Sequence, residues 1–168
     1  MMKFWNKRVQ LGRLTENLAL DDEIKTIERE IKDKVKKRFA GSLALRMVDS
    51  GSCNGCEAEC NALSNPYYNL ERLGIYFVAS PRHADVILVS GVVTINMYHH
   101  LLDVYEQMAS PKWVITLGDC PAMQGVFEKN FAIKAPVKNH LPVSHHITGC
   151  PPEPKAIMEG LLEFLRKI

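Results

Sequence analysis

Apolar residues near the start of the chain recur at intervals of three and four positions. The pattern is formed by Leu20, Ile24, Ile27, Ile31, Val35 and Phe39, and charged residues fill most of the positions between them. This spacing predicts one amphipathic helix over about Asp21 to Phe39. The apolar stripe of this helix has two interpretations. In the first, the stripe packs on its own domain or on a neighbour. In the second, the helix and the apolar and basic residues 1–14 together lie on an anionic membrane surface or between subunits.

Short apolar runs replace the helical pattern after Gly41. They predict buried strands at 43–48, 75–78, 86–89, 113–117 and about 143–148. Helices are expected between the strands, near 57–63, 96–108 and 154–166. Because strands and helices alternate, the sequence predicts an α/β domain with a parallel sheet and helices on both faces. We therefore expect two parts, a helical extension for assembly at 1–40 and the main domain at 41–168.

Composition and charge narrow the class of protein. The 168 residues include 21 Lys and Arg against 19 Asp and Glu, which gives no support to nucleic-acid binding. The charge is uneven, because residues 1–46 hold 12 Lys and Arg against 7 Asp and Glu, whereas residues 47–168 hold 9 against 12. No apolar run approaches the roughly 20 residues of a membrane span, and Met1 to Leu20 lacks the apolar centre of a secretion signal. We therefore expect a reducing compartment.

Four of the five cysteines follow predicted strands. Cys53 and Cys56 come just after the first strand, Cys120 follows the strand at 113–117, and Cys150 follows the last one. In parallel sheets, ligands bind at the loops beyond the carboxyl ends of the strands. The four thiols are therefore expected to converge on one edge of the sheet.

Two kinds of metal centre suit four thiolates, namely tetrahedral zinc and an iron–sulfur cluster. Structural zinc usually takes two close pairs of ligands, whereas here a single CxxC pair, Cys53 and Cys56, is joined by two distant cysteines. A cluster is larger and can be reached from separate loops, so the spacing favours iron–sulfur over zinc. Unliganded buried thiols are a third alternative. Prolines next to Cys120 and Cys150 indicate rigid loops, which suit a redox centre.

Five strings of residues occur in a fixed order: Ser52 to Glu59, Ser80 to Asp85, Pro111 to Ile115, Gly118 to Cys120 and Gly149 to Pro154. Together they resemble the superfamily of [NiFe]-hydrogenase small subunits and respiratory complex I 20-kDa subunits. The Cys-Asn-Gly-Cys pair is most similar to the membrane-bound, energy-converting hydrogenases and formate hydrogenlyases. The resemblance implies a flavodoxin-like fold that carries one [4Fe–4S] cluster and docks on a large catalytic hydrogenase-like subunit.

The same resemblance implies an assembly and a location. The chain is expected to be a non-autonomous subunit of an oxidoreductase complex, linked to ferredoxin. Its partners in this hetero-oligomer would include a ferredoxin-type iron–sulfur subunit and membrane-arm subunits. It would lie peripherally, at the cytoplasmic face of the membrane.

The resemblance also implies roles for individual residues within the matching motifs. The cluster ligands implied are Cys53, Cys56, Cys120 and Cys150, with Cys60 outside the pattern. Glu59 matches an acidic family position and Glu57 lies near it. Either carboxylate is expected to relay protons, or else to hydrogen-bond backbone or cap a helix. Arg82 matches a family arginine that offsets the charge of the cluster, with a solvent-facing or structural ion pair as the alternative.

Two departures from the family pattern bear on the reaction more than on the cluster. Met123 occupies a stretch that is usually rich in glycine, where only Gly125 remains. The stretch Ser144-His145-His146 replaces a more usual acidic, apolar and aromatic run before the last cysteine. The equivalent subunit of a sulfur- or quinone-reducing complex is therefore the first alternative to a hydrogenase-like complex. A zinc-stabilised scaffold module is the second.

Overall fold

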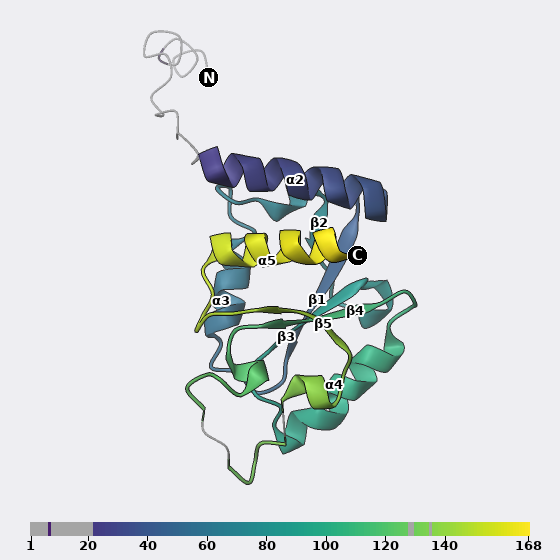
Figure 1. The fold of residues 1–168 in the computed structure, drawn as a ribbon, viewed down its shortest axis with the longest axis vertical. Coiled ribbons are helices and arrows are strands. Elements are labelled where there is room, and N and C mark those ends of the chain that lie inside the picture. The colour runs from purple at the N-terminus through teal and green to yellow at the C-terminus, as the bar shows by residue number, and fades with distance from the viewer. Residues whose placement is uncertain (1–6, 8–21, 128–129, 135) are drawn as a thin grey trace.

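Five parallel strands form one sheet in the order β2-β1-β3-β4-β5 (Figure 1). The computed structural model describes Lys7 and residues 22–127, 130–134 and 136–168. The strands are β1 (Leu43–Asp49), β2 (Ile75–Phe77), β3 (Val86–Ser90), β4 (Trp113–Leu117) and β5 (Val143–Ile147). The longer helices are α2 (Asp22–Phe39), α3 (Gly55–Ala62), α4 (Ile95–Gln107) and α5 (Pro154–Lys167). Every predicted strand and helix is confirmed to within two residues at its ends.

Helices cover both faces of the sheet, and each face has its own apolar core. On one face, α5 packs on the strands together with α3 (Figure 1). Side chains of these two helices join those of β1 in one buried cluster. On the other face, α4 packs through Leu101 and Val104 against Ile87 and Val89 of β3. All five residues of β3 are buried, because this central strand has neighbours on both sides and helices on both faces. The predicted α/β, flavodoxin-like architecture is confirmed.

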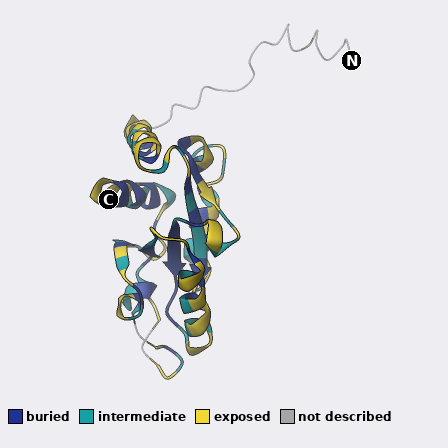
Figure 2. Ribbon diagram, turned by 90° about the vertical axis from the view of Figure 1, so that its right-hand side faces the viewer, coloured by how far each residue is buried: buried dark blue, intermediate teal, exposed yellow. Residues whose placement is uncertain are grey.

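The helix α2 packs on α5 rather than directly on the sheet. Its buried residues include Ile24, Ile31 and Val35, and Figure 2 shows the facing sides of these two helices in the colour of buried residues. A short 3-10 helix, η1 (Leu70–Leu73), contacts α2 from another side. Packing of the stripe on its own chain is therefore confirmed for residues 22–39. Leu20 and the expected membrane or subunit contact of residues 1–14 lie outside the described residues, apart from Lys7, and the division of the chain at residue 40 stays a prediction.

Candidate metal centre

The loops after β1 and β3 are tied together where the strand order reverses. The Oδ1 atom of Asp49, at the end of β1, accepts hydrogen bonds from the backbone N–H groups of Gly51 and Ser52, each at 2.7 Å. The Ser50 hydroxyl donates to the backbone oxygen of Ser90 at 2.6 Å. In doubly wound sheets, ligand sites form at such reversal points. These contacts fix the backbone that leads from the sheet into the first two cysteines.

Cys53 and Cys56 lie at the amino end of α3. Asn54 between them has a φ of 70°, in the left-handed region that Asn tolerates better than most residues. Its N–H donates to the hydroxyl oxygen of Ser52 at 3.1 Å. Cys53 is exposed, whereas Cys56 is half-buried in the first turn of the helix. The pair therefore presents one sulfur toward solvent and one toward the sheet edge.

Backbone contacts also hold the loops after β4 and β5 together. The Oδ1 atom of Asp119 accepts a hydrogen bond from the N–H of Gly149 at 2.8 Å, and the N–H of Asp119 donates to the oxygen of Gly149 at 3.0 Å. Gly118 donates its N–H to the oxygen of Ile147 at 2.8 Å. Since Cys120 and Cys150 each follow one of these residues directly, the contacts bring the third and fourth cysteines to the same edge.

Two glycines keep room for the sulfurs at this edge. A Cβ atom at Gly118 would lie 2.6 Å from Sγ of Cys56, and one at Gly125 would lie 2.4 Å from Sγ of Cys120. Any side chain at either position would therefore collide with a cysteine sulfur. Gly125 is the one glycine that remains in the stretch where this chain departs from the family pattern. Met123, in the same stretch, packs beside Cys120 and leaves the space around its sulfur open.

The thiols influence one another electrostatically. Burial raises the pKa of Cys56 to about 12, and the charges of Glu57, Cys120, Cys53 and Cys150 contribute to the rise. Burial also raises the pKa of Cys120, with Cys150 adding to the effect, while a hydrogen bond from the backbone N–H of Val126 to its sulfur acts in the opposite direction. A cationic metal group is what turns such thiols into thiolates.

The four thiols suit a soft metal group. Among the described residues, no three or more His, Cys, Asp or Glu side chains are arranged so that they could hold a metal ion. The four thiols nevertheless suit such a group as ligands, because thiolates select iron in clusters, zinc and copper(I). Gly118 and Gly125 also leave space beside two of the sulfurs. Such a group would be held by Cys53, Cys56, Cys120 and Cys150.

Glu57 reaches from α3 to the end of β3. One carboxylate oxygen accepts a hydrogen bond from the Ser90 hydroxyl, and the other is buried without a described partner. Glu57 also lines a cavity of about 310 Å³ together with Arg46 and Cys60. The Nε atom of Arg46 is likewise buried without a described partner. Sequence reasoning missed Arg46, although a charged residue inside the apolar run at 43–48 was a signal that could have found it.

The other two predicted site residues lie in different places. Arg82 is exposed on a short 3-10 turn, η2 (Pro81–His83), that precedes β3, so it lies at the opposite end of the sheet from the cysteine loops. Glu59 is half-buried on α3. Roles of Glu57 and Glu59 in proton transfer, and of Arg82 in tuning a cluster, stay predictions. For Arg82 the geometry gives no support.

The two histidines before Cys150 face different surroundings. His146 is hydrogen-bonded through Nδ1 to the Thr116 hydroxyl at 2.8 Å. His145 is buried on β5, with its Nδ1 atom 3.0 Å from Nζ of Lys167 and its Nε2 atom 3.6 Å from a carboxylate oxygen of Glu163. No described hydrogen bond or ion pair joins either histidine to a cysteine. They are part of the packing between β4, β5 and α5.

We expect protonation of His145 to destabilise the fold. Burial lowers the pKa of this imidazole, the charges of Lys167 and His146 lower it further, and Glu163 opposes them. The unfolded chain therefore binds a proton at higher pH than the folded one, so this contribution to stability is present above a pH of about 6.5 and is lost as the pH falls toward the folded pKa. Thermal unfolding followed by circular dichroism should show a smaller loss between about pH 7.5 and 5.5 in His145→Leu than in the unmodified protein. Equal losses in the two proteins would contradict this assignment.

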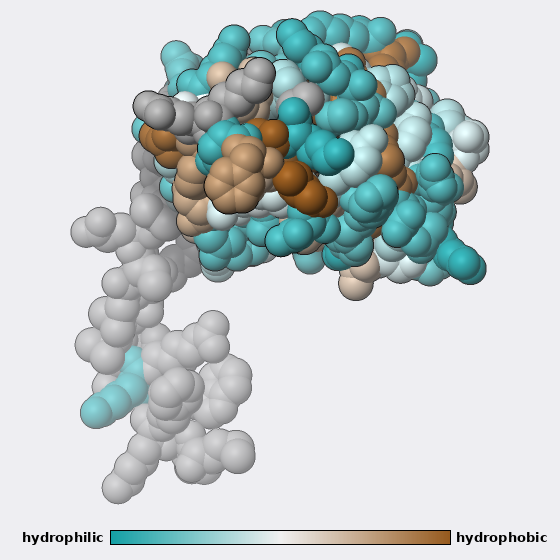
Figure 3. All heavy atoms as spheres, turned by 90° about the horizontal axis from the view of Figure 1, so that it is seen from below, coloured by the Kyte–Doolittle hydropathy of each residue, from teal (hydrophilic) through white to brown (hydrophobic). Residues whose placement is uncertain are grey.

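Apolar side chains are exposed next to Cys120. We call Ile95, Val126, Phe127 and Phe131 the Cys120 patch, and Phe131 is 94% exposed. Val126 donates its N–H to the sulfur of Cys120, and the backbone of Ile95 is hydrogen-bonded to Ala132. Figure 3 looks onto this end of the molecule and shows brown and tan side chains among the hydrophilic ones. Exposed apolar groups that gather in one place are typical of a surface covered by a partner.

The fold and the site together define a class, α/β proteins that gather four thiols at the carboxyl edge of a parallel sheet. Residues 53–164 match the family described as NADH ubiquinone oxidoreductase, 20 Kd subunit. The chain belongs to this family. The expected resemblance is thereby confirmed. Within the described residues, no helix has the length and the apolar character needed to cross a membrane.

Relatives in this family are subunits of oxidoreductase complexes. The chain is 45% identical to the probable membrane-bound hydrogenase subunit of Pyrococcus furiosus, over 72% of each chain. It is 42% identical to a subunit of the NADH-quinone oxidoreductase of Citrifermentans bemidjiense, over 67% of this chain and 66% of the relative. It is 35% identical to formate hydrogenlyase subunit 7 of Escherichia coli, over 85% of this chain and 54% of the relative. The alignment thus spans only about half to two thirds of the latter two proteins.

Solved structures of oxidoreductases also resemble this chain. The chain resembles a chain of the membrane-bound sulfane sulfur reductase, an archaeal respiratory membrane complex, with a TM-score of 0.67 and 31% identity over 80% of this chain and 72% of the other. An NAD⁺-reducing [NiFe]-hydrogenase has a TM-score of 0.56 and 15% identity over 75% of this chain and 92% of the other. At this identity the second likeness concerns the fold alone.

Proposed function

We propose that the chain holds one [4Fe–4S] cluster and transfers electrons within a membrane-bound, hydrogenase-like complex. The observation that carries the proposal is the meeting of four thiols, from three strand-end loops, at one edge of the sheet. Four thiolates are the usual ligand set of such a cluster. When bound, the cluster would supply one-electron transfer, and the chain would have no activity alone.

The residues around the thiols would fix and tune such a group. Asp49 and Asp119 tie the loops to backbone N–H groups, so the ligands would move little during a redox change. The N–H of Val126 points at the sulfur of Cys120. Hydrogen bonds to sulfur and exposure to solvent set the potentials of iron–sulfur clusters. The chain would therefore hold the cluster in position and tune its reduction potential.

The Cys120 patch supports a large catalytic subunit as the partner at this end. A partner that covered the four exposed apolar side chains would also bring its own reaction centre close to the cluster. Ferredoxin-type and membrane-arm subunits complete the proposed hetero-oligomer at the cytoplasmic face of the membrane. These partners are supported by the kinds of complex to which the relatives belong.

The second candidate is the equivalent subunit of a sulfur-reducing complex. The 31% identity and the TM-score of 0.67 to a chain of the sulfane sulfur reductase favour it. A quinone-reducing complex is a further alternative, favoured by the relatives in NADH-quinone oxidoreductase. The large subunit that co-purifies with the chain distinguishes these complexes, because a nickel site needs two CxxC pairs in that subunit. A large subunit without them would overturn the hydrogenase assignment and leave the cluster proposal intact.

Anaerobic purification tests the cluster itself. We expect about four iron and four acid-labile sulfide per chain, and an electron paramagnetic resonance signal after reduction. A colourless protein that contains one zinc and no iron would contradict the redox function and support the zinc-stabilised scaffold.

A charge on the Cys120 patch is expected to weaken assembly. Phe131→Asp replaces a phenyl ring with a carboxylate. Because Phe131 is 94% exposed, the fold and the iron content of the chain should not change. Buried in an apolar interface, the same carboxylate would be desolvated without a partner. The amount of large subunit that co-purifies with a tagged Phe131→Asp chain should fall at least about tenfold. Unchanged co-purification would show that the large subunit docks elsewhere.

A further inference from the structure

A groove follows α2 on the flank turned toward η1. Two neighbouring hollows of about 290 Å³ and 300 Å³ form this groove, and Lys32, Arg72 and Leu73 line both of them. The first hollow is also lined by Lys25, Glu28 and Arg29. The second continues past Lys36, Ala40, Gly41, Glu71, Gly74 and Tyr76, toward the edge strand β2. We call the whole feature the α2 groove.

Four cations stand in line along the α2 groove. Lys25, Arg29, Lys32 and Lys36 are spaced by four, three and four residues, which places them on one face of the helix, and all four are exposed. At 1.5 Å per residue, they span roughly 16 Å of the helix axis. Arg72 adds a fifth cation from the opposite wall.

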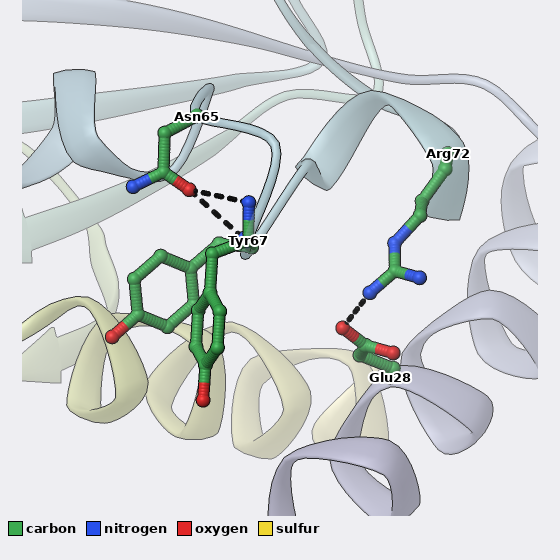
Figure 4. Close-up of polar contacts among 5 residues, drawn as sticks. Glu28, Asn65, Tyr67 and Arg72 are labelled. Carbon is green, nitrogen blue, oxygen red and sulfur yellow. Dashed lines mark hydrogen bonds and ion pairs between the residues drawn. The ribbon is translucent and has the colours of Figure 1, made fainter. Parts of the chain in front are cut away.

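The acids near these cations are few, and one of them, the exposed Glu71, lines the second hollow. Glu28 is buried under the groove and accepts a hydrogen bond from Arg72, as Figure 4 shows. Lys25 pairs with Asp22 at 2.9 Å, an exposed pair that is easily broken. Among the described residues, none forms an ion pair with Arg29, Lys32 or Lys36.

Two acids of α2 form ion pairs on its other flank. Glu23 pairs with Lys155 and Glu30 pairs with Arg166, and both basic partners belong to α5. Opposite charges thus hold α2 to its own domain on one side, while the five cations along the groove outnumber its two acids, Glu28 and Glu71. This segregation is not needed for folding, because exposed charge pairs contribute little to stability.

We propose that the α2 groove docks an extended, acidic segment of a partner protein. Charge complementarity gives the sign of the segment, and the length of the cation row fits about five residues of extended chain. The floor near Leu73, Ala40 and Tyr76 adds apolar contacts that a peptide can reach. A flat membrane surface cannot enter a hollow between two elements. Residues 1–21 of this chain hold four Lys and Arg against two Asp and Glu, so they lack the required charge.

This proposal does not depend on the cluster, and it is tested by binding. The probe is a fluorescein-labelled peptide of ten glutamates, titrated with the full chain, and the readout is fluorescence anisotropy. Arg29→Glu combined with Lys32→Glu reverses two charges inside the groove. The matched control, Lys37→Glu with Arg38→Glu, makes the same change of charge on exposed residues of α2 that line neither hollow. Circular dichroism checks that both variants keep the helix.

We expect the groove variant to weaken binding at least about tenfold and the control to weaken it by less than about threefold. Binding to the unmodified chain should also fall as salt is raised. Equal losses in the two variants, or no binding of the peptide at all, would overturn the proposal. So would groove-dependent binding of phosphatidylglycerol vesicles without peptide binding, which would assign the cations to lipid. A dimer that the groove variant alone abolishes would assign them to a second copy of the chain.

Discussion

Cys120→Ser is expected to remove the cluster from the protein, whereas Cys60→Ser is expected to leave it in place. Cys120 lies on a strand-end loop beside the other thiols and is tied to them through Asp119 and Gly149. A serine hydroxyl is a poor ligand for iron in clusters, so losing one of four thiolates should prevent stable binding. Iron and acid-labile sulfide should fall from about four of each per chain to near zero, with loss of the electron paramagnetic resonance signal.

Cys60 is the matched control on the same helix as Cys56. It is buried in the apolar core with 4% of its surface exposed, and burial raises the pKa of its thiol to about 12. Such a thiol stays protonated and unreactive at neutral pH. Because a serine hydroxyl is costly in an apolar core, Cys60→Ala provides a second control that removes the thiol without adding a polar group. Loss of iron in both Cys60 variants would show that the four ligands are wrongly chosen.

Gly118→Ala is expected to give the second-largest effect, a loss of most of the iron from a chain that still folds. Gly118 has a φ of 81°, and the added Cβ would lie 2.6 Å from the sulfur of Cys56 and 3.2 Å from the backbone oxygen of Gly149. Both contacts are too short, so the loop or the sulfur must move. A displaced ligand or loop changes the geometry that four thiolates must share.

Gly41→Ala is the control that separates the effect of the collision with Cys56 from the effect of backbone strain. Gly41 has a φ of 93°, close to that of Gly118, but an added Cβ would meet no atom within 4 Å. Each variant should lose about 1–2 kcal/mol of stability, because alanine is strained at positive φ. Only Gly118→Ala should also lose iron, measured per chain after anaerobic purification. If the two variants retain the same iron, the space beside Cys56 does not matter for the cluster.

The order of the elements was predictable because local patterns determine it. A run such as Val86–Ser90 is largely apolar, which is typical of a strand buried on both faces, and the periodic stripe of α2 defines a helix. The sequence pattern left open what that stripe packs on. The structure buries it against α5, and it also places Glu28 within the stripe, because Arg72 from η1 supplies the partner that an isolated helix lacks.

The cysteine loops were predictable for a related reason. In a parallel sheet all carboxyl ends lie at one edge, so residues that follow strands must meet there whatever their distance in sequence. The same argument explains why Arg82 lies away from the cysteine loops. It follows β2 in the sequence but precedes β3, and the short crossover between them carries it to the amino end of the sheet. A match between sequence motifs does not show at which end of the sheet a residue lies.

The sequence by itself determined which elements form, their parallel order along the chain, and the four thiols that meet at one edge, because these follow from local periodicity and from the direction of the strands. Only the tertiary structure decided how closely Gly118 and Gly125 approach the sulfurs, how Glu57 reaches Ser90, and which flank of α2 keeps its cations. Those features depend on contacts between residues far apart in the chain, and such contacts are fixed by packing in three dimensions rather than by any local pattern.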